Sequence, residues 1–169
     1  IELWGQRPEG RAGMVTAGSD DWDDVVRLVA PVTQRDLIYS CAVGDPDPVA
    51  LPDLFAGLRG AGDGLRVLMH DYFPLSPNPT LLGDGDRWQG LPDPAQAGAR
   101  HHTQRPDGTP VSLAQWQAAW GRLLDQADRV DHFCQTSRDL LAQVYPRARS
   151  VVRPHELPVA VPAVPRPAA

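Results

Sequence analysis

A strand, a helix and a second strand follow one another between residues 36 and 69, and this run constrains the fold more than any other feature of the chain. Residues 36–43 (DLIYSCAV) are apolar and rich in β-formers, which predicts a strand buried on both faces of a sheet. Residues 49–64 carry apolar side chains at helical spacing and end in a glycine-rich stop, and residues 65–69 (LRVLM) predict the next strand. Because strands joined in this way run parallel, the chain predicts an α/β fold.

The alternation of helices and strands continues toward the C-terminus. Residues 112–127 predict an amphipathic helix capped by Ser112, whose two tryptophans we expect to pack against the sheet rather than anchor a membrane or stack on a sugar. The other predicted elements are a helix capped by Ser19 or Asp20, a strand at 128–135, a helix capped by Thr136 or Ser137 and a strand at 149–157. Together they predict a mostly parallel sheet with helices on both faces, which is a three-layer domain.

Two segments lack this periodicity. Residues 74–111 are rich in Pro, Gly, Asp and Gln, and a loop of this length is usually either functional or disordered. Residues 158–169 are rich in Pro and Ala, which favours an extended linker leading to an absent C-terminal domain. The chain of 169 residues therefore predicts one domain over residues 1–157, followed by the linker at 158–169.

The composition argues against several classes of function. The chain has 16 basic residues, all of them arginine, and 21 acidic residues, so it lacks the basic face that nucleic acid binding requires. It contains no apolar run of roughly 20 residues and does not open with a signal peptide, so we expect a cytoplasmic protein. Cys41 and Cys134 lie far apart in apolar runs, and we expect both to be buried free thiols.

Each predicted strand ends in polar residues. In chain order they are Ser40 to Asp45, then His70 and Asp71, then His132, Thr136 and Ser137, and finally His155 and Glu156. In open parallel sheets, ligands bind beyond the carboxyl ends of the strands, so these residues predict a binding crevice without naming a reaction. The pair His70 and Asp71 is the sharpest of these features, because a histidine at a strand end can carry a proton near neutral pH. The alternative is a structural histidine that bonds backbone carbonyls in a tight corner.

Other polar groups have simpler interpretations. His132 alternates with apolar residues in a short strand, which favours a structural role, and His101 and His102 in the long loop are expected to face solvent rather than a metal. The acidic residues Asp20, Asp21, Asp23 and Asp24 are typical of a helix start, with a metal site as the less favoured alternative. The chain has no P-loop, no H-E-x-x-H, no G-x-S-x-G and no G-x-G-x-x-G that opens a helix after a strand, so it predicts none of those sites.

Four passages in order resemble the N-terminal domain of retaining GT-B-fold glycosyltransferases, the group called glycosyltransferase family 4-like. They are HDYF at 70–73 with the following turn, the strand and helix leading to it, residues 120–146 (WGRLLDQADRVDHFCQTSRDLLAQVYP), and VVRPHEL at 151–157. The resemblance covers about residues 36–157. It implies a Rossmann-like domain that forms one half of a GT-B architecture, with the acceptor on this half and most of the nucleotide-sugar on the other.

The resemblance also implies roles for individual residues. The family histidine at the end of this strand matches His70, which is then the catalytic residue that contacts the donor sugar or positions the reacting groups. The residues implied to contact substrate are Asp71, Tyr72, Ser76, Asn78, Thr80, Ser137, His155 and Glu156. Many members of this group have a cysteine where this chain has Ser76, so a metal in that loop is not expected.

The implied activity is the transfer of a sugar from a nucleotide-sugar to a hydroxyl of a glycan or lipid-linked acceptor. The resemblance implies that the nucleotide-sugar is a co-substrate and that the reaction needs no cofactor and no metal. The missing C-terminal GT-B domain is the implied partner, and the full enzyme is expected in the cytoplasm, with peripheral association at the inner face of the membrane as an option. The isolated chain is expected to be inactive.

Two alternatives to this interpretation remain open. The first is a noncatalytic binding or assembly module of the same fold, suggested by the changed loop after HDYF. The second is an unrelated doubly wound domain, such as a response-regulator-like or hydrolase domain. The second alternative requires an acidic pocket or a nucleophile that the sequence does not display.

Overall fold

The computed structural model describes residues 2–3, 17–18 and 21–155. It divides the chain into two compact units, one made of Ile1–Arg35 with Gly60–Asp63 and the other of Asp36–Arg59 with Gly64–Ala169. Four of the predicted features lie outside the described residues, namely Ser19, Asp20, Glu156 and the linker at 158–169. The single domain over residues 1–157 therefore stays a prediction.

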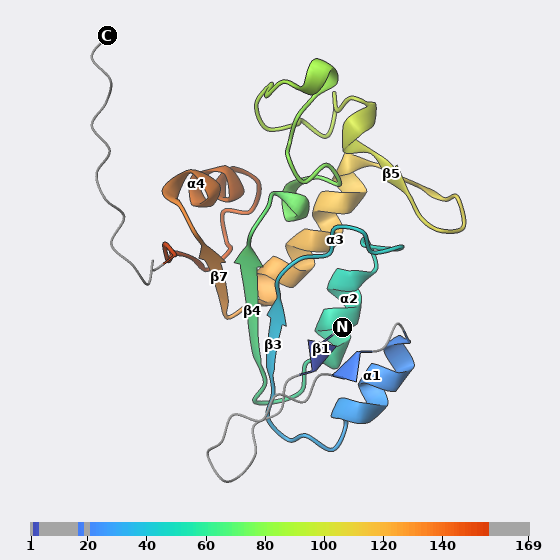
Figure 1. Cartoon of the computed structure of the whole chain (residues 1–169). Coiled ribbons are helices and arrows are strands. Elements are labelled where there is room, and N and C mark those ends of the chain that lie inside the picture. Colours follow the sequence, from blue (N-terminus) through green and yellow to red (C-terminus); the bar gives the residue numbers. More distant parts are fainter. Residues whose placement is uncertain (1, 4–16, 19–20, 156–169) are drawn as a thin grey trace, which may run out of the picture. The chain divides into compact units, whose positions relative to one another are not determined.

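The second unit contains a four-stranded parallel sheet (Figure 1). Its strands are β3 (Asp36–Tyr39), β4 (Gly64–Met69), β7 (Arg129–His132) and β8 (Ser150–Val152), and they lie side by side in the order β3-β4-β7-β8. All three neighbouring pairs are parallel. This arrangement confirms the predicted α/β class and the parallel strand–helix–strand unit, and it is compatible with a Rossmann-like domain.

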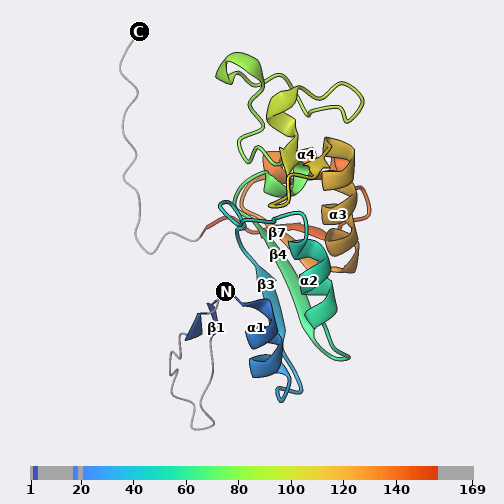
Figure 2. The ribbon, with the colours of Figure 1, turned by 90° about the vertical axis from the view of Figure 1, so that its right-hand side faces the viewer.

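Three helices of this unit contribute to one hydrophobic core on one face of the sheet. They are α2 (Leu51–Leu58), α3 (Leu113–Gln126) and α4 (Gln135–Val144). Alternate strand residues such as Val67 and Val130 point into this core, where they meet Trp116 and Trp120 of α3 and Leu141 of α4. Figure 2 shows α2 and α3 on the same side of β3 and β4. Right-handed crossovers between strands that follow chain order place successive helices on one face, which explains this arrangement.

The opposite face of the sheet, which we call the open face, carries exposed apolar side chains. Ile38 of β3 retains 44% of its accessible surface and Val151 of β8 retains 40%. The prediction that residues 36–43 form a strand buried on both faces is therefore wrong: β3 ends at Tyr39 and, among the described residues, pairs only with β4. The described part of this unit has two layers, and the predicted third layer stays a prediction.

Helix α3 agrees closely with its sequence pattern. The Ser112 side chain accepts a hydrogen bond from the backbone N–H of Gln115, and the Gln115 side chain accepts one from the backbone N–H of Ser112. This reciprocal capping box satisfies N–H groups that a helix start leaves without partners. Trp116 and Trp120 are fully buried, as predicted, and Trp116 Nε1 donates to the Phe73 carbonyl at 2.8 Å. The helix is thereby fixed to the segment that follows β4.

Two predicted helix caps and one burial prediction are wrong. The Asp21 side chain, rather than Ser19 or Asp20, caps α1 (Trp22–Val29) by accepting from the Asp23 N–H. Cys134, rather than Thr136 or Ser137, caps α4. Both cysteines are free thiols as predicted, yet both are exposed rather than buried, because Cys41 and Cys134 follow the ends of β3 and β7 instead of lying within these strands.

The first unit holds a short antiparallel pair and one helix. The pair consists of β1 (Glu2–Leu3) and β2 (Ala17–Gly18), and the helix is α1, which buries Val25. Within the same unit, the Asp63 carboxylate accepts from the Arg35 backbone N–H and from Arg35 Nε, each at 2.8 Å. These hydrogen bonds, led by the one from the guanidinium, hold the pKa of Asp63 below its ordinary value.

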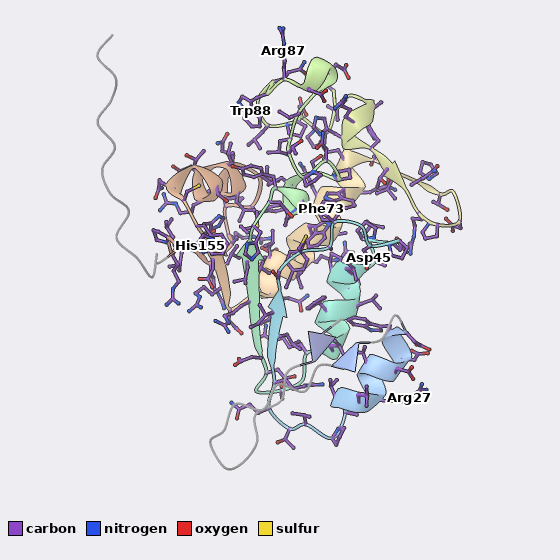
Figure 3. The ribbon with its side chains drawn as sticks, in the orientation of Figure 1. Arg27, Asp45, Phe73, Arg87, Trp88 and His155 are labelled. Carbon is purple, nitrogen blue, oxygen red and sulfur yellow. The ribbon has the colours of Figure 1, made fainter. Side chains whose placement is uncertain are left out.

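The long segment between β4 and α3 contains local structure. It includes the 3₁₀ turns η1 (Phe73–Leu75), η2 (Asp84–Asp86) and η3 (Ala99–His101), and an antiparallel pair of β5 (Thr103–Gln104) and β6 (Pro110–Val111). Arg87 and Trp88 project outward from this segment in Figure 3. Among the described residues, no helix combines the length and apolar character that a bilayer-spanning segment requires.

Candidate functional site at the carboxyl ends of the strands

A pocket of about 230 Å³ lies where β4, β7 and β8 end. Its lining residues are Met69, His70, Asp71, Tyr72, Phe133, Cys134, Ser137 and His155. Five of these, namely His70, Asp71, Tyr72, Ser137 and His155, are residues that the sequence predicted for the site. They come together because the carboxyl ends of parallel strands share one edge of the sheet.

The strand register explains how the polar residues reach this edge. Met69, the last residue of β4, is buried and lies opposite His132, the last residue of β7. Because successive side chains of a strand point to opposite faces, the residue that follows each strand points to the other face of the sheet. Those next residues are His70 and Phe133. His70 is exposed, and its ring centroid lies 4.8 Å from that of Phe133.

His155 completes a row of three rings on this face. Its ring stacks on Phe133 with a centroid distance of 4.0 Å and an angle of 8° between the planes, and it lies 6.5 Å from the ring of His70. Figure 3 shows His155 beside β7. Flat rings with polar nitrogens at both ends of the row present an apolar surface next to hydrogen-bonding groups, which is the usual composition of a small-molecule site.

Asp71 supports the turn that follows His70. One carboxylate oxygen accepts from the Phe73 backbone N–H at 2.8 Å, and the Cys41 thiol lies 3.6 Å from the other. The backbone N–H of Tyr72 bonds the Pro79 carbonyl, which draws the following loop toward the pocket. Burial, aided by the nearby Cys134, raises the pKa of the Tyr72 hydroxyl, so this group stays protonated and can donate a hydrogen bond.

Ser76, Asn78 and Thr80 do not line the pocket. Ser76 is fully buried, with its hydroxyl 2.8 Å from His101 Nδ1 and accepting from the Asn78 N–H at 3.1 Å. The Asn78 side chain donates to the Leu82 carbonyl and accepts from the Thr80 hydroxyl, each at 2.7 Å. These bonds give all three residues a place in the scaffold of the loop, and the substrate contacts that the resemblance implies for them stay a prediction.

His101 is buried rather than solvent-facing, which corrects that expectation, whereas His102 is exposed. Burial, together with the neighbouring His102, lowers the pKa of His101. A neutral imidazole can accept a hydrogen bond from the Ser76 hydroxyl at Nδ1, which fits the short contact between them.

His132 lies behind the pocket on the face of the sheet that α2, α3 and α4 cover, which we call the covered face. It is fully buried, with Nδ1 3.0 Å from the Ser137 hydroxyl and Nε2 3.1 Å from the Ser150 hydroxyl. Burial, with a smaller contribution from Arg138, lowers its pKa to about 4. His132 is therefore neutral at physiological pH, and its two hydroxyl contacts give it the structural role that the strand pattern favoured.

Three lining residues, Met69, Phe133 and Cys134, were missed by reasoning from sequence. Phe133 and Cys134 directly follow β7, and Cys134 accepts the Ser137 N–H through its sulfur at 3.4 Å. The sequence predicted a strand over 128–135 and so placed both residues inside it; because β7 ends at His132, they instead reach the same edge of the sheet as His70.

The described residues contain no group of three or more His, Cys, Asp or Glu side chains arranged to hold a metal ion. Comparisons of the whole chain with protein-family models, with curated proteins and with solved structures found no match. The geometry of the pocket is therefore the main ground for a functional conclusion.

Proposed function

We propose that this chain is the acceptor-side domain of a retaining, GT-B-type glycosyltransferase that moves a sugar from a nucleotide-sugar to a hydroxyl of a glycan or lipid-linked acceptor. The observation that carries this proposal is the pocket at the carboxyl edge of the parallel sheet, which unites His70, Asp71, Tyr72, Ser137 and His155. These residues come from three separate passages of the sequence that resemble that family, in the same order.

The lining residues can be given roles in such a transfer. His70 is exposed at the strand end, where a nitrogen can hydrogen-bond the donor sugar or the reacting hydroxyl. Tyr72 and Ser137 supply hydroxyls for an acceptor sugar, and the stacked rings of Phe133 and His155 supply a flat apolar wall beside them. Asp71 holds the turn that carries His70 and Tyr72.

The rest of the proposal concerns parts outside this chain. A C-terminal domain supplies most of the nucleotide-sugar site, no metal takes part in the chemistry, and the whole enzyme works in the cytoplasm, with peripheral association at the inner face of the membrane. On this account the chain alone binds an acceptor but does not transfer a sugar.

Ligand titration of the 169-residue chain followed by nuclear magnetic resonance tests the acceptor site. Methyl α-D-glucopyranoside and methyl α-D-mannopyranoside serve as probes, and signals of Met69, His70, Tyr72 and Phe133 are expected to shift. His70→Ala should weaken binding, whereas His102→Ala, which removes an exposed histidine outside the pocket, should not. Equal effects of the two variants, or no shift with either probe, would count against the proposal.

The transfer activity has its own test. The isolated chain should release no nucleotide from UDP-glucose or GDP-mannose above the blank. In the protein that also carries the second domain, His70→Ala should lower kcat by roughly 10²-fold with the fold intact, since a misplaced reacting group costs about that much. Unchanged turnover would remove His70 from the assigned role.

A noncatalytic binding module of the same fold is the second candidate. It is favoured by one observation, namely that the loop residues Ser76, Asn78 and Thr80 bond within the loop instead of lining the pocket. If the gene continues past Ala169 into a second α/β domain with a nucleotide-binding motif, the enzyme is favoured, and otherwise the binding module is.

A further inference from the structure

The buried imidazole of His132 connects a residue of the pocket to a residue outside it. Ser137 lines the pocket on the first turn of α4, whereas Ser150 is the first residue of β8 and does not line it. The His132 ring lies between their hydroxyls, at 3.0 Å and 3.1 Å. We refer to these three residues as the Ser150–His132–Ser137 hydrogen-bond chain.

The chemistry of a neutral imidazole couples the directions of the two hydrogen bonds in this hydrogen-bond chain. A neutral ring carries a hydrogen on one nitrogen only, so one nitrogen donates and the other accepts. If Nδ1 donates to Ser137, then Nε2 must accept from Ser150, and the reverse holds for the other tautomer. The polarity of the hydrogen bond at Ser150 therefore fixes the polarity of the bond at Ser137.

Because Ser137 lines the pocket, the hydrogen-bonding capacity that His132 leaves unused at the Ser137 hydroxyl can serve a ligand there. When Nδ1–H donates to the Ser137 oxygen, the Ser137 hydrogen is free to be donated to a ligand oxygen. When Ser137 instead donates to Nδ1, only an acceptor lone pair is left for the ligand. The start of α4 carries a partial positive charge, so ligand oxygens that accept hydrogen bonds are favoured at this place.

We propose that His132 is a positioning residue that holds the Nδ1–H tautomer, with Ser150 donating to Nε2, so that Ser137 donates its hydroxyl hydrogen to a ligand oxygen in the pocket. Ser150 thereby influences binding although it does not touch the ligand. His132 does not act as a base in this scheme, since its ring stays neutral and gives up no proton to the ligand. The choice of ligand class rests on the proposed function, but the tautomer does not.

The tautomer is tested first, in the ligand-free 169-residue chain at pH 7. Long-range ¹H–¹⁵N correlation spectra of the imidazole distinguish a protonated from a bare ring nitrogen. We expect a protonated Nδ1 and a bare Nε2 for His132. Ser150→Ala removes the donor to Nε2 and should move the population toward the Nε2–H form, while Ser150→Thr, which keeps the hydroxyl, should restore the wild-type pattern. A protonated Nε2 in the wild type, or no change in Ser150→Ala, would overturn the proposal.

The effect on binding is tested with methyl α-D-glucopyranoside as the probe. Ser150→Ala should weaken its binding about fivefold, the loss expected for one hydrogen bond of reversed polarity, and Ser150→Thr should recover the wild-type affinity. If His132 is merely structural, Ser150→Ala will lower stability and leave the probe affinity unchanged, which would overturn the influence of Ser150 on binding. If the wild type does not bind the probe while the tautomer is as expected, the glycan site fails and the polarity assignment stands.

Discussion

The two faces of the four-stranded sheet differ in what covers them. On the face toward α2, α3 and α4, Leu65 and Val67 are fully buried and Met69 nearly so, whereas Ile38 and Val151 on the other face keep two fifths or more of their surface. Parallel sheets are usually covered on both faces, so the difference places most of the stabilising burial of this unit on one side. Substitutions on the two faces should therefore have separable effects.

Trp116→Ala should cause the largest loss of stability. The side chain is fully buried against Phe73 and Trp120 and donates its Nε1–H to the Phe73 carbonyl, so its removal leaves a cavity and takes one of the two donors from that carbonyl, which keeps the Ser76 N–H. We expect the free energy of unfolding to fall by about 3–5 kcal/mol, measured by urea denaturation. A loss below about 1 kcal/mol would mean that the helix-covered core does not carry the fold.

Acid should destabilise the chain through His132, a titratable group on the covered face. The unfolded chain binds a proton near the ordinary pKa of 6.5, whereas the folded chain does so only near 4. As the pH falls from 6.5 toward 4, the unfolded state is therefore favoured increasingly, and the stability present above pH 6.5 is lost. Between pH 7.5 and 4.5 this loss is expected to be about 2–3 kcal/mol.

The comparison of wild type with His132→Gln isolates this contribution. The carboxylates and His101 titrate in both proteins, and burial lowers the pKa of His101 as well. The loss of stability between pH 7.5 and 4.5 should therefore be smaller in the variant, by about the 2–3 kcal/mol that His132 contributes. Direct titration of the His132 ring by nuclear magnetic resonance gives a second measurement. A midpoint above 6 in that titration would contradict the burial of the ring.

A matched pair of valine substitutions compares the two faces directly. Val67→Ala removes two methyl groups from a fully buried site on β4 and should cost about 2 kcal/mol, whereas Val151→Ala on the open face should cost about 0.5 kcal/mol or less. Both values come from urea denaturation at constant m. A cost above about 1.5 kcal/mol at Val151 would show that the open face is covered in solution and would remove the difference between the faces.

The last prediction concerns the start of α3. Ser112→Ala removes one half of the capping box and should lower the free energy of unfolding by about 1 kcal/mol. Ser40→Ala, at an exposed serine after β3, is the control and should be nearly neutral. Thermal denaturation of both variants alongside the wild type would reveal the difference, and equal melting temperatures would contradict the capping contribution.

The sequence was most informative where one physical rule determines the outcome. Helical spacing and a good N-cap located α3, and the strand–helix–strand run located two parallel strands, because periodicity and capping act over a few residues. Among the described strands, β3 lies at the edge of the sheet, and this position depends on which strands become neighbours, which is not local information. An apolar run such as residues 36–43 fits a central strand and an edge strand equally well.

The candidate site divides in the same way. His70, Asp71, Tyr72, Ser137 and His155 were predictable because every parallel strand delivers its following residues to one edge. The fate of Ser76 was not predictable, since a loop side chain can turn toward a ligand or toward its own loop, and here it meets His101, 25 residues away. Cys134 was missed as a cap because cysteine is not among the residues that usually occupy that position.

The order of the strands has a consequence for synthesis on the ribosome. Because β3, β4, β7 and β8 lie side by side in the order in which they occur along the chain, each strand that emerges finds its neighbour already in place. The sheet can thus grow outward from β3 during synthesis without waiting for a later segment to insert between earlier ones. A nascent chain stalled after α3 should already contain the β3–β4 pair with its two helices, protected from protease.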